Sequence, residues 1–185
     1  MALTIVVEDG AGRSDANSYI SRADADAYFE GRPNAAAWTG ATTGEKEMAL
    51  VMATRVVDAM FRFHGYKMNQ SQALLWPRME CPDVESSVRQ VPGIRVAGVA
   101  YLPSDSVPAC VWDATCEVAR ELLIEDRTGD PEGVGMRSMG VDGVFKMVFD
   151  PLRPKPIVPR LVQAMLRRVG FHLGGRGASV PIVRG

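Results

Sequence analysis

Aromatic and basic side chains are densest between Phe61 and Arg78, where the sequence reads FRFHGYKMNQSQALLWPR. Ring faces can stack on bases while lysine and arginine follow the phosphates, so this composition could bind single-stranded DNA. Rings at the exit of a helix also form corners of a hydrophobic core, with basic side chains lying over them. The sequence favours this second use. If the stretch does bind DNA, the contacting side chains would be Phe63, Tyr66, Lys67, Trp76 and Arg78.

Patterns that would indicate catalysis or a bound metal are not found in the sequence. The two histidines, His64 and His172, stand in no metal-ligand spacing. The serine-nucleophile, Walker A and dinucleotide-binding patterns are absent. Cys110 and Cys116 have no identifiable basic partner, which favours two core thiols over a nucleophile. We therefore expect a binding or structural protein rather than an enzyme, with no cofactor.

The composition is that of an ordinary globular chain. Of its 185 residues, 46% are hydrophobic and 23% are charged, which suits one domain with extensions. Three cysteines without a C-x-x-C pair indicate reduced thiols rather than disulfides or zinc. No run approaches the roughly 18 apolar residues of a membrane span, so we expect no membrane partner.

The charge is unevenly distributed along the chain. The net charge is −1, yet the first 150 residues carry 14 basic and 22 acidic side chains, a balance of −8. No acid follows Asp150, and seven basic residues do. Such a segment suits an acidic partner, a phosphate backbone or a neighbouring subunit. The candidate partner-binding residues are Arg160, Arg167, Arg168, Arg176 and Arg184.

The periodicity predicts a mainly α fold, a bundle of about four helices with long extended loops, a small β-hairpin and a C-terminal arm. Ser21 is a good N-cap for a first helix over 22–30. A further turn is expected at 35–38, and Pro108 suits the first turn of a later helix. The two remaining helices are predicted over 45–62 and 161–169.

The apolar residues also predict which faces are buried. The first helix should turn Ala23, Ala27 and Tyr28 inward. The helix that begins near Pro108 carries two adjoining apolar lines, one of which includes Trp112, and should be the central helix. Its Glu117 is expected on a solvated face or facing a basic neighbour. The apolar stripe of the second helix is predicted to hold Met48, Val51, Met52, Val56, Ala59, Met60 and Phe63.

Four regions follow from these elements. An extended arm is expected over 1–20, then a helical core over 21–127 that includes a long loop at 80–106. Asp142-Gly143 is a strong two-residue turn, so a β-hairpin is predicted within 128–150. The last region, 151–185, should hold a Pro-rich linker, the short helix and a flexible basic tail.

Several ordered motifs resemble a known family of tailed phages. They are DANSYI at 15–20, ADADAY at 23–28, the helix from EKE at 45–47 to Asp58, GYK at 65–67, QALLWPR at 72–78 and LPSDSVP at 102–108. In this order they resemble the head-to-tail adaptor, or connector, proteins. Such sequences also carry a second description, a DnaT-like single-stranded DNA-binding protein.

The adaptor resemblance implies a structural virion protein that is assembled in the host cytoplasm. It would form a homo-oligomeric ring, usually of twelve, that docks under the portal protein and contacts a tail or head-closure protein. Double-stranded DNA would pass through the lumen of the ring. The acidic body and the long loops favour this function. The alternative is a single-stranded DNA-binding protein that uses residues 61–78.

Overall fold

The computed structural model describes residues 3–84, 100–126, 128 and 156–173, with the backbone of 138–141 and 145–148. Five helices lie in this part of the chain: α1 (Arg22–Glu30), α2 (Ala36–Thr39), α3 (Thr43–Met60), α4 (Ala109–Ile124) and α5 (Arg160–Leu166). The strands are β1 (Phe61–Phe63), β2 (Tyr66–Lys67), β3 (Arg78–Met79), β4 (Ser138–Val141), β5 (Phe145–Val148) and β6 (Gly170–His172). The strands pair into three two-stranded antiparallel sheets, β1–β6, β2–β3 and β4–β5. The prediction of a mainly helical fold with a small β part is confirmed at this level.

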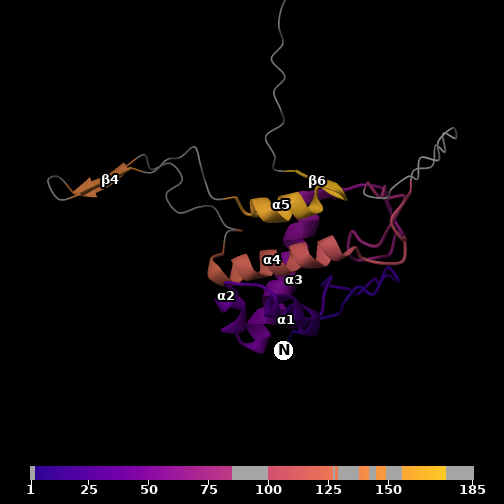
Figure 1. Ribbon diagram of the computed structural model, residues 1–185, viewed down its shortest axis with the longest axis horizontal. Helices are drawn as coiled ribbons and strands as arrows, with labels where there is room; N and C mark the ends of the chain where they lie inside the picture. The colour runs from indigo at the N-terminus through magenta and orange to yellow at the C-terminus, as the bar shows by residue number, and fades with distance from the viewer. Residues whose placement is uncertain are drawn as a thin grey trace, which may run out of the picture.

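Helix α4 is the centre of the body. It packs across α3 and also contacts α1, α2 and α5. Figure 1 shows α1 and α2 on one side of α4, with α5 and β6 on the other. The prediction of a central helix that is buried on more than one side is therefore confirmed.

Helix α1 has the predicted bounds, because the residues next to its first turn supply the N-cap that a helix needs. The Ser21 side chain accepts a hydrogen bond from the Asp24 amide, which stabilises the first turn. Its buried face was predicted only in part: Tyr28 packs against the core as expected, but Ala23 and Ala27 are exposed, and the buried residues are Ala25 and Phe29. Phe29 turns inward because its ring stacks on Trp38 of α2, with the centroids 4.7 Å apart.

Helix α3 begins at a capping box, in which Thr42 and Glu45 bond each other's backbone amides. It ends at Met60, so the prediction that the helix continues to Arg62 and presents Phe63 is wrong. The predicted stripe is confirmed in part: Val51 and Val56 are buried and Met52 and Met60 pack against the core, whereas Met48 and Ala59 are exposed. The buried side also includes Ala49, Leu50, Ala53, Thr54 and Val57.

Strand β1 follows α3 directly and pairs with β6, so that Phe61 faces His172 and Phe63 faces Gly170. A Cβ atom on Gly170 would lie 2.7 Å from the Arg62 carbonyl oxygen, a contact too close for any other residue without movement. The glycine is therefore needed for the close approach of the two strands. The prediction of a flexible tail from Gly170 onward is wrong for residues 170–173.

The first twenty residues were predicted to form an extended arm, but much of this segment packs on the helical core. Ala16, Tyr19 and Ile20 are buried. The buried Glu8 carboxylate accepts hydrogen bonds from the backbone amides of Gly10, Gly12 and Arg13. The Glu8 amide donates to the Ser18 carbonyl oxygen at 2.9 Å, so this segment turns back on itself and belongs to the core instead of forming an arm.

The remaining predictions fall partly outside the described residues. The β4–β5 hairpin is confirmed, with Val141 opposite Phe145, while the turn residues 142–144 lie outside. The same holds for 85–99 of the long loop and for the basic tail from 174. Among the helices of the described part, none is long and apolar enough to cross a membrane.

Candidate nucleic-acid interface

Three of the five side chains predicted to contact DNA are buried in the core. Phe63 and Trp76 pack edge to face, with their centroids 5.6 Å apart, and Arg78 is only 9% exposed. Their faces are closed to a base, so the prediction that these three contact DNA is wrong. The corner of a hydrophobic core, which the sequence favoured, is what they form.

Arg78 stabilises the backbone of this corner. Its Nε donates to the carbonyl oxygen of His64 at 2.7 Å, and its Nη atoms donate to those of Phe63, Gly65 and Leu75. Burial lowers the pKa of Arg78, an effect that the nearby Asp58 and Tyr19 partly oppose. One guanidinium therefore connects the β1–β2 turn to the segment before β3.

A second polar cluster lies beneath the same corner. The Tyr19 hydroxyl donates to one carboxylate oxygen of Asp58, and the Leu75 amide donates to the other at 3.0 Å. The Trp76 amide donates to the Tyr19 hydroxyl at 3.3 Å. Burial raises the pKa of Asp58 to about 6, and burial followed by the Asp58 charge raises that of Tyr19. Residues of the motifs at 15–20, 45–58 and 72–78 thus meet inside the protein. There they hold the backbone of Leu75 and Trp76 in place and do not bind a ligand.

We expect Asp58 to make the free energy of unfolding fall as the pH rises. The folded pKa of about 6 lies above the ordinary value of 3.8, so the folded state binds the extra proton between these pH values. The contribution of Asp58 should decrease by about 2 to 3 kcal/mol from pH 4 to pH 6. Denaturant titrations of the wild type and Asp58→Asn at several pH values measure it, because the difference between the two isolates this residue. A difference that does not change over this range would contradict the assignment.

The other two predicted side chains remain accessible. Tyr66 is 67% exposed. Lys67 is half-buried, and its Nζ donates to the Gln72 carbonyl oxygen at 3.2 Å. Tyr66 is therefore available to a base, whereas Lys67 also holds the adjacent loop.

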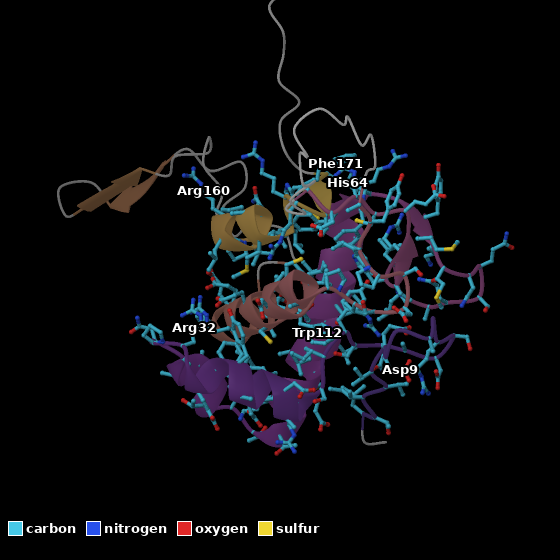
Figure 2. All side chains as sticks on the ribbon, turned by 45° about the vertical axis from the view of Figure 1, so that its right-hand side comes forward. Asp9, Arg32, His64, Trp112, Arg160 and Phe171 are labelled. Carbon is cyan, nitrogen blue, oxygen red and sulfur yellow. The ribbon has the colours of Figure 1, made fainter. Side chains whose placement is uncertain are left out.

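The outer face of the β1–β6 ribbon carries a second set of exposed side chains. Arg62 and Phe171 stand opposite each other in the register, and both are exposed. Phe171 is 51% exposed, and the centroid of its ring lies 6.3 Å from that of His64. We call Arg62, His64 and Phe171 the outer ribbon face; Figure 2 shows the last two side by side. Phe171 was not among the predicted contact residues, because only the pairing of β6 with β1 reveals which side its ring faces. The available signal was the alternation along β1 and the residue after it, where Arg62 and His64 are exposed and Phe61 and Phe63 are buried.

The predicted basic residues extend this surface. Arg160 begins α5, and Arg167 and Arg168 lie between α5 and β6. Residues 160–173 include these three arginines and no acid. In Figure 2, Arg160 lies along the same upper side as His64 and Phe171. Arg176 and Arg184 lie outside the described residues.

Comparison with known proteins yields one family. The family described as "Putative DnaT-like ssDNA binding protein" has a model that matches residues 3–185. The chain belongs to this family. No curated protein and no solved structure gives a significant match to the chain.

This membership corrects the first functional prediction. The matching family is described by single-stranded DNA binding, which overturns the prediction of a head-to-tail adaptor ring in the virion. The predicted portal, tail-protein and ring-subunit partners lose their basis with it. The alternative function, single-stranded DNA binding with a nucleic-acid partner, agrees with the description of the family.

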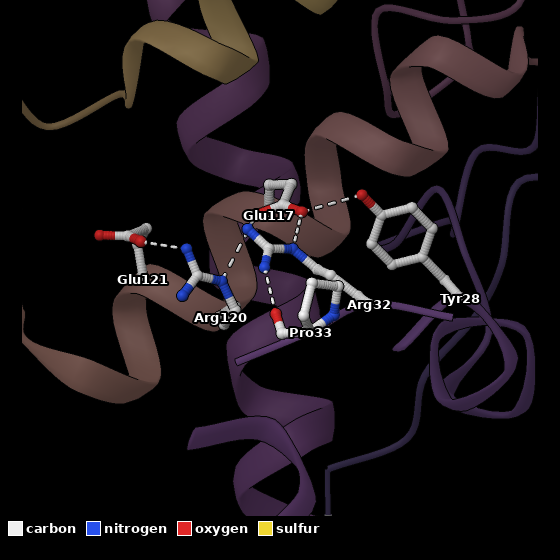
Figure 3. Close-up of polar contacts among 6 residues, drawn as sticks. All are labelled: Tyr28, Arg32, Pro33, Glu117, Arg120 and Glu121. Atoms are coloured by element: carbon white, nitrogen blue, oxygen red, sulfur yellow. Dashed lines mark hydrogen bonds and ion pairs between the residues drawn. The ribbon is translucent and has the colours of Figure 1, made fainter. Parts of the chain in front are cut away.

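A third polar cluster lies remote from the outer ribbon face. Glu117 of α4 is 3% exposed, and its carboxylate accepts hydrogen bonds from Arg32 and the Tyr28 hydroxyl (Figure 3). The Nε atom of Arg120 lies 3.4 Å from Oε2 of Glu117. Burial alone would raise the pKa of Glu117, but the hydrogen bonds of Arg32 and Tyr28 lower it below its ordinary value. The solvated face predicted for Glu117 is wrong, because α1 and the segment after it cover this carboxylate.

Proposed function

We propose that the chain binds single-stranded DNA on the outer ribbon face together with the arginines of the α5–β6 segment. The observation that carries the proposal is the exposed Phe171 ring, which lies across from Arg62 and beside His64. The family description supports the same ligand.

The chemistry of this surface suits an unpaired strand. Phe171 and His64 offer ring faces, and stacking of a base on an aromatic side chain contributes about 1 to 3 kcal/mol. Paired bases keep their faces inside the duplex, so they would gain little from these rings. The cations of Arg62, Arg160 and Arg167 would neutralise phosphates along the strand. The sequence of 160–173 itself contributes no acid to this surface.

Binding should be salt-dependent and should require Phe171. Three phosphate contacts predict a slope of about −2 for log K against log salt with single strands. Loss of one stacked base predicts that Phe171→Ala weakens binding of (dC)12 about tenfold. Fluorescence anisotropy of the labelled oligonucleotide between 50 and 200 mM salt measures both quantities.

Trp112→Ala supplies the matched control. Trp112 is another exposed ring, 40% accessible on α4, and Figure 2 shows it well below Phe171 and His64. Its removal should leave the affinity unchanged. The proposal fails if the wild type does not bind (dC)12 at 50 mM salt, or if both substitutions weaken binding equally.

A further inference from the structure

A cavity of about 280 Å³ lies between the start of α4 and the end of α5. Its walls are mainly apolar, with Val84, Leu102 and Ala109 among them, and Asp83 and Arg168 supply charge. A second, more open hollow of about 540 Å³ shares Val84 and Arg168 with it and adds Arg167. The two hollows therefore share a wall, so a mainly apolar recess lies next to a hollow that two arginines line. We call the pair of hollows the depression.

This depression and the outer ribbon face are built on the same short segment. Val169 lines the cavity, and its carbonyl oxygen accepts a hydrogen bond from the His64 amide at 2.9 Å. The next two residues, Gly170 and Phe171, belong to the ribbon. A strand whose bases stack on Phe171 would thus lie only a few residues of protein backbone from the cavity.

We propose that the cavity receives one base of the bound strand, while Arg167 and Arg168 bind the phosphates beside that base. This inference rests on the proposed function and names a subsite for it. An apolar recess beside two cations fits a ring that is attached to an anion, which is what a nucleotide offers.

The cavity and the open ribbon surface would contact a base in different ways. Stacking on Phe171 accepts any base, because every base has a π face. A base in the cavity would instead lie between its walls, so the volume of about 280 Å³ limits what can enter. Filling the cavity should therefore remove the contribution of a base and leave the contribution of the sugar-phosphate backbone intact.

Ala109→Phe tests this directly. Ala109 is an exposed residue in the first turn of α4, so a larger side chain can occupy the cavity without disturbing the core. The matched control is Ala23→Phe, the same change at an exposed position in the first turn of α1, on the far side of α4. Val84→Trp fills the cavity from another wall and serves if Ala109→Phe does not fold. The probes are labelled (dC)12 and a 12-mer of abasic sites, followed by anisotropy at 50 mM salt.

We expect Ala109→Phe to weaken binding of (dC)12 about tenfold, to leave binding of the abasic 12-mer unchanged, and Ala23→Phe to change neither. If the variant binds (dC)12 as the wild type does, or loses affinity equally for both probes, the base subsite is wrong and the proposed function stands. A wild type that binds neither probe refutes the proposed function itself, and the subsite with it.

Discussion

Arg78→Met is expected to lower the free energy of unfolding by about 4 kcal/mol. The substitution removes the hydrogen-bond donor to four backbone carbonyl groups, and an unsatisfied buried polar group costs about 1 to 3 kcal/mol. The sum is smaller than four separate costs because the β1–β2 turn can relax toward water. Urea denaturation and thermal melting measure the loss, which should lower the melting temperature by roughly 10 °C.

Two further variants make this result specific to the guanidinium. Arg78→Lys keeps the positive charge but loses the planar fork, so it should recover little of the stability. Arg62→Met removes an exposed arginine from the adjoining strand, and its effect should stay within about 0.5 kcal/mol. Equal unfolding midpoints for Arg78→Met and the wild type would show that the four contacts do not stabilise the fold.

Glu117→Gln is expected to destabilise the fold by about 3 kcal/mol. Removing one partner of a buried ion pair leaves the other charge uncompensated, and here the Arg32 guanidinium would lose its carboxylate (Figure 3). Chemical denaturation at pH 7 measures the effect. Glu47→Gln is the matched control, because Glu47 pairs with Arg22 at 3.8 Å near the surface, where such pairs contribute about 0 to 1 kcal/mol.

The pH dependence of the Glu117 effect has the opposite sign to that of Asp58. The pKa of Glu117 is held below its ordinary value of 4.5, so its contribution is complete above pH 4.5 and is lost as the pH falls through the folded pKa. The difference in stability between Glu117→Gln and the wild type should therefore shrink in acid. A difference that stays constant down to pH 3 would contradict the ion pair.

The elements with complete local signals were predictable from the sequence. Ser21 and Asp24 fix the start of α1, Pro108 precedes the first residue of α4, and Asp142-Gly143 lies between β4 and β5. Each signal acts within four residues, so its effect on the local structure does not depend on contacts with distant parts of the chain. The capping box of Thr42 and Glu45 was equally available, and its use would have placed the start of α3 at Thr43.

The errors arose where distant residues decide the outcome. The spacing of Val56, Met60 and Phe63 continues a helical pattern, yet pairing with residues beyond 169 makes Phe61–Phe63 a strand. In the sequence, Glu117 looks like one of a row of exposed acids. The fold places Arg32, which lies 85 positions earlier, in contact with its carboxylate. Neither partner is visible in a local window.

At the candidate site, too, local sequence predicted one part of the outcome and contacts between distant residues decided the other. The composition of 61–78 correctly drew attention to this part of the molecule, but burial decides which rings can meet a ligand. Trp76 and Phe63 face the core, while Phe171, which lies outside the stretch, is exposed beside His64. Dense aromatic sequence therefore located the neighbourhood of the proposed interface, and the pairing of two strands selected its residues.

The β1–β6 pairing also bears on how the protein is synthesised. His172 leaves the ribosome about 110 positions after Phe61, its partner in the ribbon. At translation rates of 5 to 20 residues per second, the synthesis of α5 and β6 is complete roughly 6 to 20 s after that of α3 and β1. Throughout this interval the nascent chain lacks Val162, Leu166 and Val169, which are fully buried in the finished core. The incomplete core exposes apolar surface to chaperones and to neighbouring nascent chains, so the speed at which codons 62–172 are read should influence how much protein folds correctly.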